Sequence, residues 1–89
     1  MTMEQRIVAR LTETLDPIDL AVVDESDLHA GHAGARKGGG THYRVRVVSA
    51  QFENRSRVER HRLVYGLLTA EFAEGLHALA LVAKAPGEP

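Results

Sequence analysis

Histidine is the residue type in this sequence best suited to chemistry, and five histidines are spread over its 89 residues. His29 and His32 lie in a glycine-rich stretch, while His42 and His77 each stand where a segment rich in β-forming residues begins. Neutral imidazole is a common ligand of borderline metals such as zinc, copper and iron. The chain contains no cysteine, so it offers neither a thiolate ligand nor a disulfide. The histidines are therefore the candidates for a metal site.

Two kinds of metal site are compatible with these residues. A mononuclear zinc site needs three or four protein ligands in a tetrahedral arrangement. Alternatively, two histidines can ligate one iron of a 2Fe–2S cluster, and the thiolates for the second iron must then come from another molecule. Two histidines have a structural alternative. A hydrogen bond to neighbouring backbone is favoured for His42, and a buried structural role is favoured for His61, which falls on the apolar side of a predicted helix.

Two capping boxes, each a threonine or serine followed three residues later by glutamine or glutamate, predict helices over residues 3–15 and 57–72. Asp16 ends the first helix because it precedes a proline, and Gly75 can end the second. The side chains expected to face the core are Ile7, Val8, Leu11 and Leu15 in the first helix, and Val58, His61, Val64, Leu67 and Leu68 in the second.

Three segments predict β-strands, over residues 18–24, 42–49 and 77–83. In the second strand Tyr43, Val45 and Val47 should face the core, and His42, Arg44 and Arg46 the other side. A short helical turn is expected near residues 50–53. Residues 25–41 show no periodicity and predict a flexible loop, because loops of this length are usually functional or disordered. The tail over residues 85–89 is expected to fray.

The order of these elements predicts that four histidines converge. If the second helix forms a crossover, the last strand runs parallel to the middle strand, and both begin at the same edge of the sheet. His42 and His77 then start neighbouring strands. His29 and His32 lie in the loop at that same edge.

The composition predicts one small domain over residues 1–89, because 44% apolar content and this length suffice for a single core. A formal net charge of −1 argues against a polyanion binder that works by bulk electrostatics. No apolar run reaches membrane-spanning length and no signal-peptide core stands at the N-terminus, so a cytoplasmic protein with no membrane association is expected. No nucleophile–base pair is evident, since Ser26 and Ser49 both have ordinary structural roles, and the chain is not expected to be an enzyme.

Four short stretches in matching order resemble the BolA family across about residues 5–86. They are Val23-Asp24-Glu25-Ser26, Thr41-His42-Tyr43, Arg60-His61-Arg62-Leu63-Val64-Tyr65 and Leu76-His77-Ala78-Leu79. The resemblance implies an α+β fold of order α-β-β-α-α-β, similar to the class II KH module, with a three-stranded mixed sheet and helices packed on one face. One departure is Asn54, which stands where the family often has a glycine before the long helix. Asparagine tolerates the left-handed conformation, so this turn should survive.

The resemblance also implies a function. BolA proteins pair with monothiol glutaredoxins and share a glutathione-bound 2Fe–2S cluster, whose thiolates come from the partner's cysteine and from glutathione. By this resemblance His77 is one ligand. His29 best matches the ligand from the loop, and His32 leaves that choice open. The chain would then act in cluster trafficking or in iron and redox regulation, as a monomer or weak homodimer when alone.

DNA binding and transcriptional regulation, linked to stress responses, form the alternative function, since BolA proteins are also described as DNA-binding. Arg55, Arg57, Arg60 and Arg62 give the long helix a basic first half that could contact phosphates. A solvated helix face balanced by Glu59 is the simpler interpretation, and the near-neutral net charge favours it. The Gly-x-x-Gly loop of nucleic-acid-binding KH domains is missing between Phe52 and Arg60.

Overall fold

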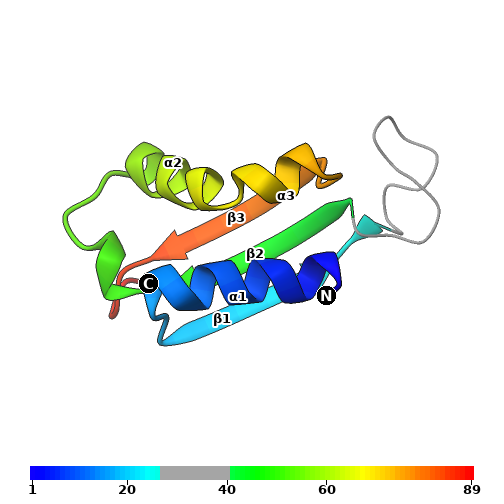
Figure 1. The fold of residues 1–89 in the computed structure, drawn as a ribbon. Coiled ribbons are helices and arrows are strands. Elements are labelled where there is room, and N and C mark those ends of the chain that lie inside the picture. The colour runs from blue at the N-terminus through cyan, green and yellow to red at the C-terminus, as the bar shows by residue number, and fades with distance from the viewer. Residues whose placement is uncertain (27–40) are drawn as a thin grey trace.

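The computed structural model describes residues 1–26 and 41–89 (Figure 1). The elements are α1 (Met3–Leu15), β1 (Asp19–Asp24), β2 (His42–Val48), the 3₁₀ turn η2 (Ala50–Phe52), α2 (Arg57–Leu67), α3 (Thr69–Ala73) and β3 (Ala78–Lys84). All three predicted strands and the short turn near residue 50 are therefore present. Among the described residues, no helix is long and apolar enough to cross a membrane.

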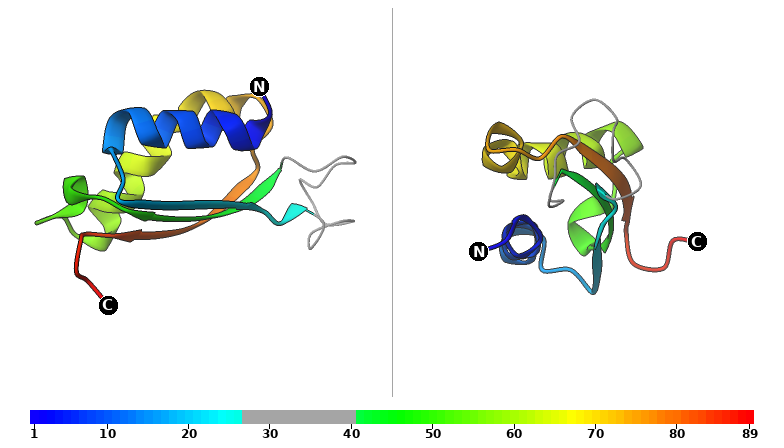
Figure 2. Two further views of the ribbon diagram at one scale, coloured as in Figure 1. Left: turned by 90° about the horizontal axis from the view of Figure 1, so that it is seen from below. Right: turned by 90° about the vertical axis from the view of Figure 1, so that its right-hand side faces the viewer.

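The three strands form one sheet in the order β1-β2-β3. β1 pairs antiparallel with β2, with Val22 opposite Val45, and β3 pairs parallel with β2, with Leu81 opposite Val45. The chain between β2 and β3 is the predicted crossover. Figure 2 shows α1 and α3 on one side of the sheet, with α2 running beside β3. The α+β fold with a mixed sheet is confirmed.

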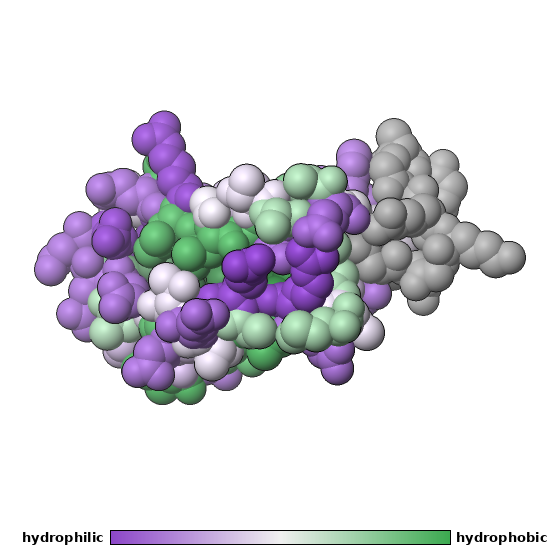
Figure 3. Space-filling view, viewed as in Figure 1, coloured by the Kyte–Doolittle hydropathy of each residue, from purple (hydrophilic) through white to green (hydrophobic). Residues whose placement is uncertain are grey.

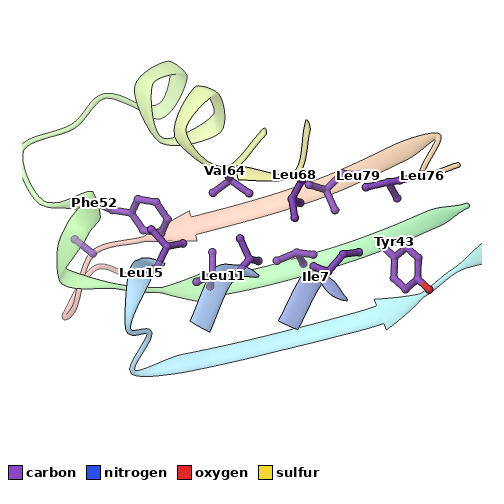
Figure 4. Packing of buried hydrophobic residues seen from close by; sticks show 12 residues of the cluster. Ile7, Leu11, Leu15, Tyr43, Phe52, Val64, Leu68, Leu76 and Leu79 are labelled. Atoms are coloured by element: carbon purple, nitrogen blue, oxygen red, sulfur yellow. The ribbon is translucent and has the colours of Figure 1, made fainter. Parts of the chain in front are cut away.

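The core lies between the sheet and the helices (Figure 4). It is built from side chains of β2 and β3 on one side and of α1 and α2 on the other, joined by the turn at Phe52. Its buried members are Ile7, Leu11, Leu15, Tyr43, Val45, Val47, Phe52, Val64, Leu68, Leu76, Leu79 and Ala85. The inward set predicted for β2 is confirmed, because Tyr43, Val45 and Val47 are buried while Arg44 and Arg46 are exposed. Val8, which was expected to face the core, is 38% exposed.

The capping boxes form as predicted. Thr2 accepts a hydrogen bond from the amide of Gln5, and the Gln5 side chain accepts one from the amide of Thr2. Ser56 and Glu59 make the same reciprocal pair at the start of α2. Asn54 has a φ of 62°, so it takes the left-handed conformation expected of the residue that replaces the family's glycine.

The helix predicted over residues 57–72 is wrong as a single element, because the chain breaks at Leu68 into α2 and α3. The order α-β-β-α-α-β that the family resemblance implied is confirmed. Leu68 has ψ of 18°, and its amide donates to the carbonyl of Tyr65 in a 3₁₀-type turn. Thr69 donates its hydroxyl to the carbonyl of Gly66 at 2.9 Å. Glycine and a threonine that bonds back to the helix both weaken continuous helix, whereas apolar periodicity does not register either effect.

The buried stripe predicted for this helix is also partly wrong. Val58 is 56% exposed and His61 is partly exposed. The helix faces the sheet through Arg60, Val64 and Leu68, which are four residues apart and therefore share one face. Val58 is two positions from Arg60, which places it on the opposite side.

The tail predicted to fray is held in place. Ala85 is 5% exposed, and its amide donates to the carboxylate of Glu88 at 3.0 Å. Both carboxylate oxygens of Glu88 accept from Arg60, at 2.6 and 2.8 Å. The composition of the tail predicts fraying because it gives no sign of Arg60, the residue of α2 that binds Glu88.

A buried ion pair joins α1 to α3. Glu71 has no exposed side-chain surface, and its Oε2 accepts from Nε of Arg6 at 3.0 Å. Arg10 lies 3.4 Å from Oε1, and Arg6 also contacts Glu74 at 2.5 Å. In Figure 3 a hydrophilic band lies between α1 and α3. The buried carboxylate of Glu71 therefore links α1 directly to α3.

Replacing Glu71 with alanine should therefore destabilise the fold. Loss of this carboxylate leaves the half-buried Arg6 guanidinium with Glu74 alone, and we expect a decrease of about 2 kcal/mol in the free energy of unfolding. Urea denaturation measures it. Glu13→Ala, at an exposed position of α1, is the control and should change stability by less than about 0.5 kcal/mol. Equal effects of the two variants would contradict the structural role of Glu71.

The Arg60–Glu88 contact predicts a pH dependence. Hydrogen bonding from Arg60, and then from the amide of Ala85, lowers the pKa of Glu88 from 4.5 to about 2. Since the folded-state pKa is the lower one, the contact stabilises the tail above about pH 4.5, and this stabilisation is lost as the pH falls toward 2. A carbon-13 NMR titration of the Glu88 carboxyl group follows the change. In Arg60→Met the midpoint should rise by more than one pH unit, and an unchanged midpoint would show that Arg60 is not the cause.

Candidate functional site

His42, which begins β2, and His77, which immediately precedes β3, lie together. His42 is the first residue of β2 and is in register with Ala78, so His77 lies beside it at the same sheet edge. Their ring centroids are 5.2 Å apart with the planes tilted by 51°. This confirms the predicted convergence for these two residues. His29 and His32, the other predicted ligands, lie outside the residues that the structure describes.

The two rings differ in exposure. His77 is exposed, whereas His42 is only 5% exposed. Nδ1 of His42 lies 2.8 Å from the hydroxyl of Thr41, so a neighbouring side chain helps to hold its ring. His42 is therefore a fixed neighbour of the more accessible His77.

A serine hydroxyl organises the backbone at this edge. Oγ of Ser26 accepts from the amides of Thr41 and His42, at 3.0 and 3.2 Å. The amide of Ser26 donates to the carboxylate of Asp24 at 2.8 Å. The carbonyl of Thr41 in turn accepts from the amide of His77 at 2.8 Å.

Sequence reasoning gave Ser26 only an ordinary structural role. The signal available was the Asp24-Glu25-Ser26 pattern, since an aspartate side chain commonly bonds the amide two residues further on. That pattern predicts a local turn. It does not reveal that the serine hydroxyl also binds the start of β2.

A cavity of about 270 Å³ adjoins His42. It is lined by Glu25, His42, Tyr43, Arg44, Ala78, Leu79 and Ala80. Arg44 and Glu25 pair across it at 3.0 Å. Burial raises the pKa of Tyr43, and the charge of Asp24 raises it further, so the phenol stays protonated at neutral pH and is not an anionic ligand.

His61 belongs to a different part of the molecule. It stacks on Tyr65, with the ring centroids 6.4 Å apart and the planes within 7°. It lines a cavity with Arg57, Lys84 and Glu88, at the end of β3 opposite His77. Its partial exposure corrects the expectation of a buried histidine, but its separation from the other pair supports leaving it out of the metal site.

Arg60, one of the four predicted phosphate-binding arginines, is used inside the fold. Besides its two bonds to Glu88, it donates to the carbonyl of Ala83 at 3.2 Å and to that of Arg55 at 3.0 Å. Only 13% of its side chain is exposed. Arg60 therefore joins the start of α2 to β3 and the tail.

The other three arginines differ from Arg60. Arg55 donates from Nε to the carbonyl of Gln51 at 2.9 Å but is exposed. Arg57 and Arg62 are exposed on α2. The basic run seen in the sequence is thus only partly a surface feature, because Arg60 is committed to intramolecular hydrogen bonds.

The residues at the histidine edge fit a shared metal centre better than a complete one. Over residues 1–26 and 41–89, no three or more His, Asp or Glu side chains gather into a metal site. A pair of imidazoles with one ring exposed is compatible with a group that takes its remaining ligands from elsewhere. The absence of cysteine from the sequence requires any thiolate ligand to come from another molecule.

Comparison with known proteins gives consistent matches. The BolA-like protein family model matches residues 11–88. SufE-like protein 1 (chloroplastic/mitochondrial) of Arabidopsis thaliana is 49% identical over 87 residues, which cover 93% of this chain and 24% of that protein. The chloroplastic protein BOLA1 of the same plant is 47% identical over 85 residues, which cover 93% of this chain and 53% of the relative. The chain thus spans about half or less of these two relatives.

The solved structure of the BolA domain of SufE1 from Arabidopsis thaliana superposes with a TM-score of 0.90 at 46% identity. That match covers 100% of this chain and 98% of the solved chain. The agreement therefore extends over the whole fold, including the sheet edge that carries His42 and His77. Together, the family model, the relatives and the shared structure show that the chain belongs to the BolA family.

Proposed function

We propose that this chain is a non-enzymatic partner protein that supplies histidine ligands to a 2Fe–2S cluster shared with a monothiol glutaredoxin. The observation that carries the proposal is the exposed imidazole of His77 beside His42, at the edge where the segment containing His29 and His32 joins β2. His77 is the first ligand in this proposal, and either His29 or His32 is the second. The lack of cysteine in the sequence is compatible with a reducing compartment such as the cytoplasm.

The chain's own contribution is an accessible nitrogen ligand on a fixed backbone. A bound 2Fe–2S cluster would supply one-electron redox chemistry or be passed to another protein, and its thiolates would come from the glutaredoxin cysteine and glutathione. Imidazole carries no charge, so a histidine in place of a thiolate raises the reduction potential. Imidazole is also protonated in mild acid, which makes such a ligand easier to release than a thiolate.

The alternative of a DNA-binding regulator has less support. Phosphate contacts need long cationic side chains that are free to reach the backbone of the nucleic acid. Arg60 is bound to Glu88 and to two carbonyl groups, and the net charge of the whole chain is −1. The exposed arginines Arg55, Arg57 and Arg62 form only a modest basic surface.

His77→Ala tests the ligand assignment. When the wild-type chain is mixed with a cluster-loaded monothiol glutaredoxin, visible absorption and circular dichroism should change as a histidine replaces another ligand. We expect His77→Ala to lose this change and to bind the loaded partner at least about tenfold more weakly. His61→Ala, on the far side of the fold, should behave like the wild type.

The same titration with His29→Ala and His32→Ala separates the two candidates for the second ligand, because only one of them should alter the spectrum. A wild-type spectral change in His77→Ala would sink the proposal.

A further inference from the structure

We propose that the hydroxyl group of Ser26 positions His77 for ligation, acting through the backbone that lies between them. The inference rests on the proposed function, since it takes His77 to be a ligand. It makes Ser26 a positioning residue of the site, with a role distinct from that of the histidines themselves.

Ser26 is itself held in place by burial and by a hydrogen bond. It is only 5% exposed, and its amide donates to Asp24, the last residue of β1. The regular ladder between β1 and β2 ends with the amide of Glu25 donating to the carbonyl of His42. Beyond that point the acceptor for the amides of Thr41 and His42 is the side-chain hydroxyl of Ser26. Without it, the amides of Thr41 and His42 would lose this acceptor, and buried amides require partners.

One peptide group transmits the effect across β2. The carbonyl of Thr41 and the amide of His42 belong to one planar trans peptide group. This peptide group is a rigid plate, and the carbonyl and the amide point away from it in opposite directions. The amide end donates to Ser26 at 3.2 Å. The carbonyl end accepts from the amides of His77 and Ala78, at 2.8 and 3.1 Å. Any rotation of the plate therefore changes both sides together.

His77 depends on that plate for its place. His77 precedes β3. The hydrogen bond from its amide to the carbonyl of Thr41 holds its backbone beside His42. Its side chain is exposed, and its ring lies beside that of His42. A ligand must be held within a fraction of an ångström of its productive position, and here the restraint comes from the backbone. Loss of the Ser26 hydroxyl should loosen His77 without removing any histidine.

The opposite end of β2 provides a matched control. Ser49 follows the strand, is fully buried, donates to the carbonyl of Leu15 at 2.5 Å and accepts from the amide of Gln51 at 3.1 Å. Ser49→Ala therefore removes the same chemical group from an equally buried serine at the end of β2 far from His77. Comparing Ser26→Ala with Ser49→Ala separates positioning of His77 from a general loss of stability.

Native-state hydrogen exchange provides the first measurement and needs no cofactor. In Ser26→Ala the amides of Thr41, His42 and His77 should exchange about tenfold faster than in Ser49→Ala, after correction for global stability. In Ser49→Ala the faster amides should lie near Gln51 instead. Equal exchange of the His77 amide in the two variants would overturn the inference.

The second measurement uses a cluster-loaded monothiol glutaredoxin. Ser26→Ala should shift the visible circular dichroism of the mixture or weaken binding, whereas Ser49→Ala should match the wild type, and Ser26→Thr should restore the signal because it keeps the hydroxyl. If His77→Ala alters the spectrum but Ser26→Ala does not, the inference fails and the proposed function stands. If neither alters it, the proposed function fails, while hydrogen exchange still decides whether Ser26 restrains His77.

The wild-type chain gives an independent test should Ser26→Ala not fold. The amides of Thr41, His42 and His77 should open as one unit, with a common free energy and the same dependence on urea. Three unrelated opening energies would show that the plate does not couple Ser26 to His77.

Discussion

Parallel pairing between β2 and β3 is the constraint on which the rest of this structure depends. The α2–α3 crossover returns the chain to the same edge from which β2 began, so His42 and His77 become neighbours although they are far apart in the sequence. The same crossover places α2 and α3 against the side of the sheet where Tyr43, Val45 and Val47 are buried. One topological choice therefore produces both the core and the histidine pair.

Buried polar groups also hold this arrangement together. Glu71 ties α1 to α3 through Arg6, and Ser26 and Ser49 hold the two ends of β2. Hydrogen bonds of this kind add little net stability individually, but leaving one unmade in the interior is costly. They consequently specify one register for a small domain whose core contains few aromatic side chains. The exposed side chain of His77 then projects from a backbone that is held by a hydrogen bond to Thr41.

Side chains of α2 bind carbonyl groups on the edge of β3 that faces away from β2. The amide of Ala78 donates to the carbonyl of Thr41, just before β2, and the carbonyl of Lys84 accepts from the amide of Ser49. The carbonyls of Leu79 and Ala83 therefore point away from β2. Tyr65 donates to the first at 2.7 Å and Arg60 to the second at 3.2 Å. Covering outward-facing carbonyls with side chains is a common protection against pairing with another chain. Arg60 therefore has a structural use that a count of basic residues does not reveal.

The sequence by itself determined the elements whose signals are local. Capping boxes located the starts of α1 and α2, alternation located β2, and Asn54 indicated its own left-handed turn, because each depends on residues within one or two turns of chain. The family motifs and the crossover rule also brought His42 and His77 to one edge, while the choice between His29 and His32 stays a prediction. At Leu68 the family resemblance implied two helices, but several weak local signals compete there and periodicity did not place the boundary. Only the tertiary structure decided the partners of Arg60, Glu71 and Ser26 and the anchoring of the tail. These features depend on hydrogen bonds between residues distant in the chain, so composition and periodicity do not encode them.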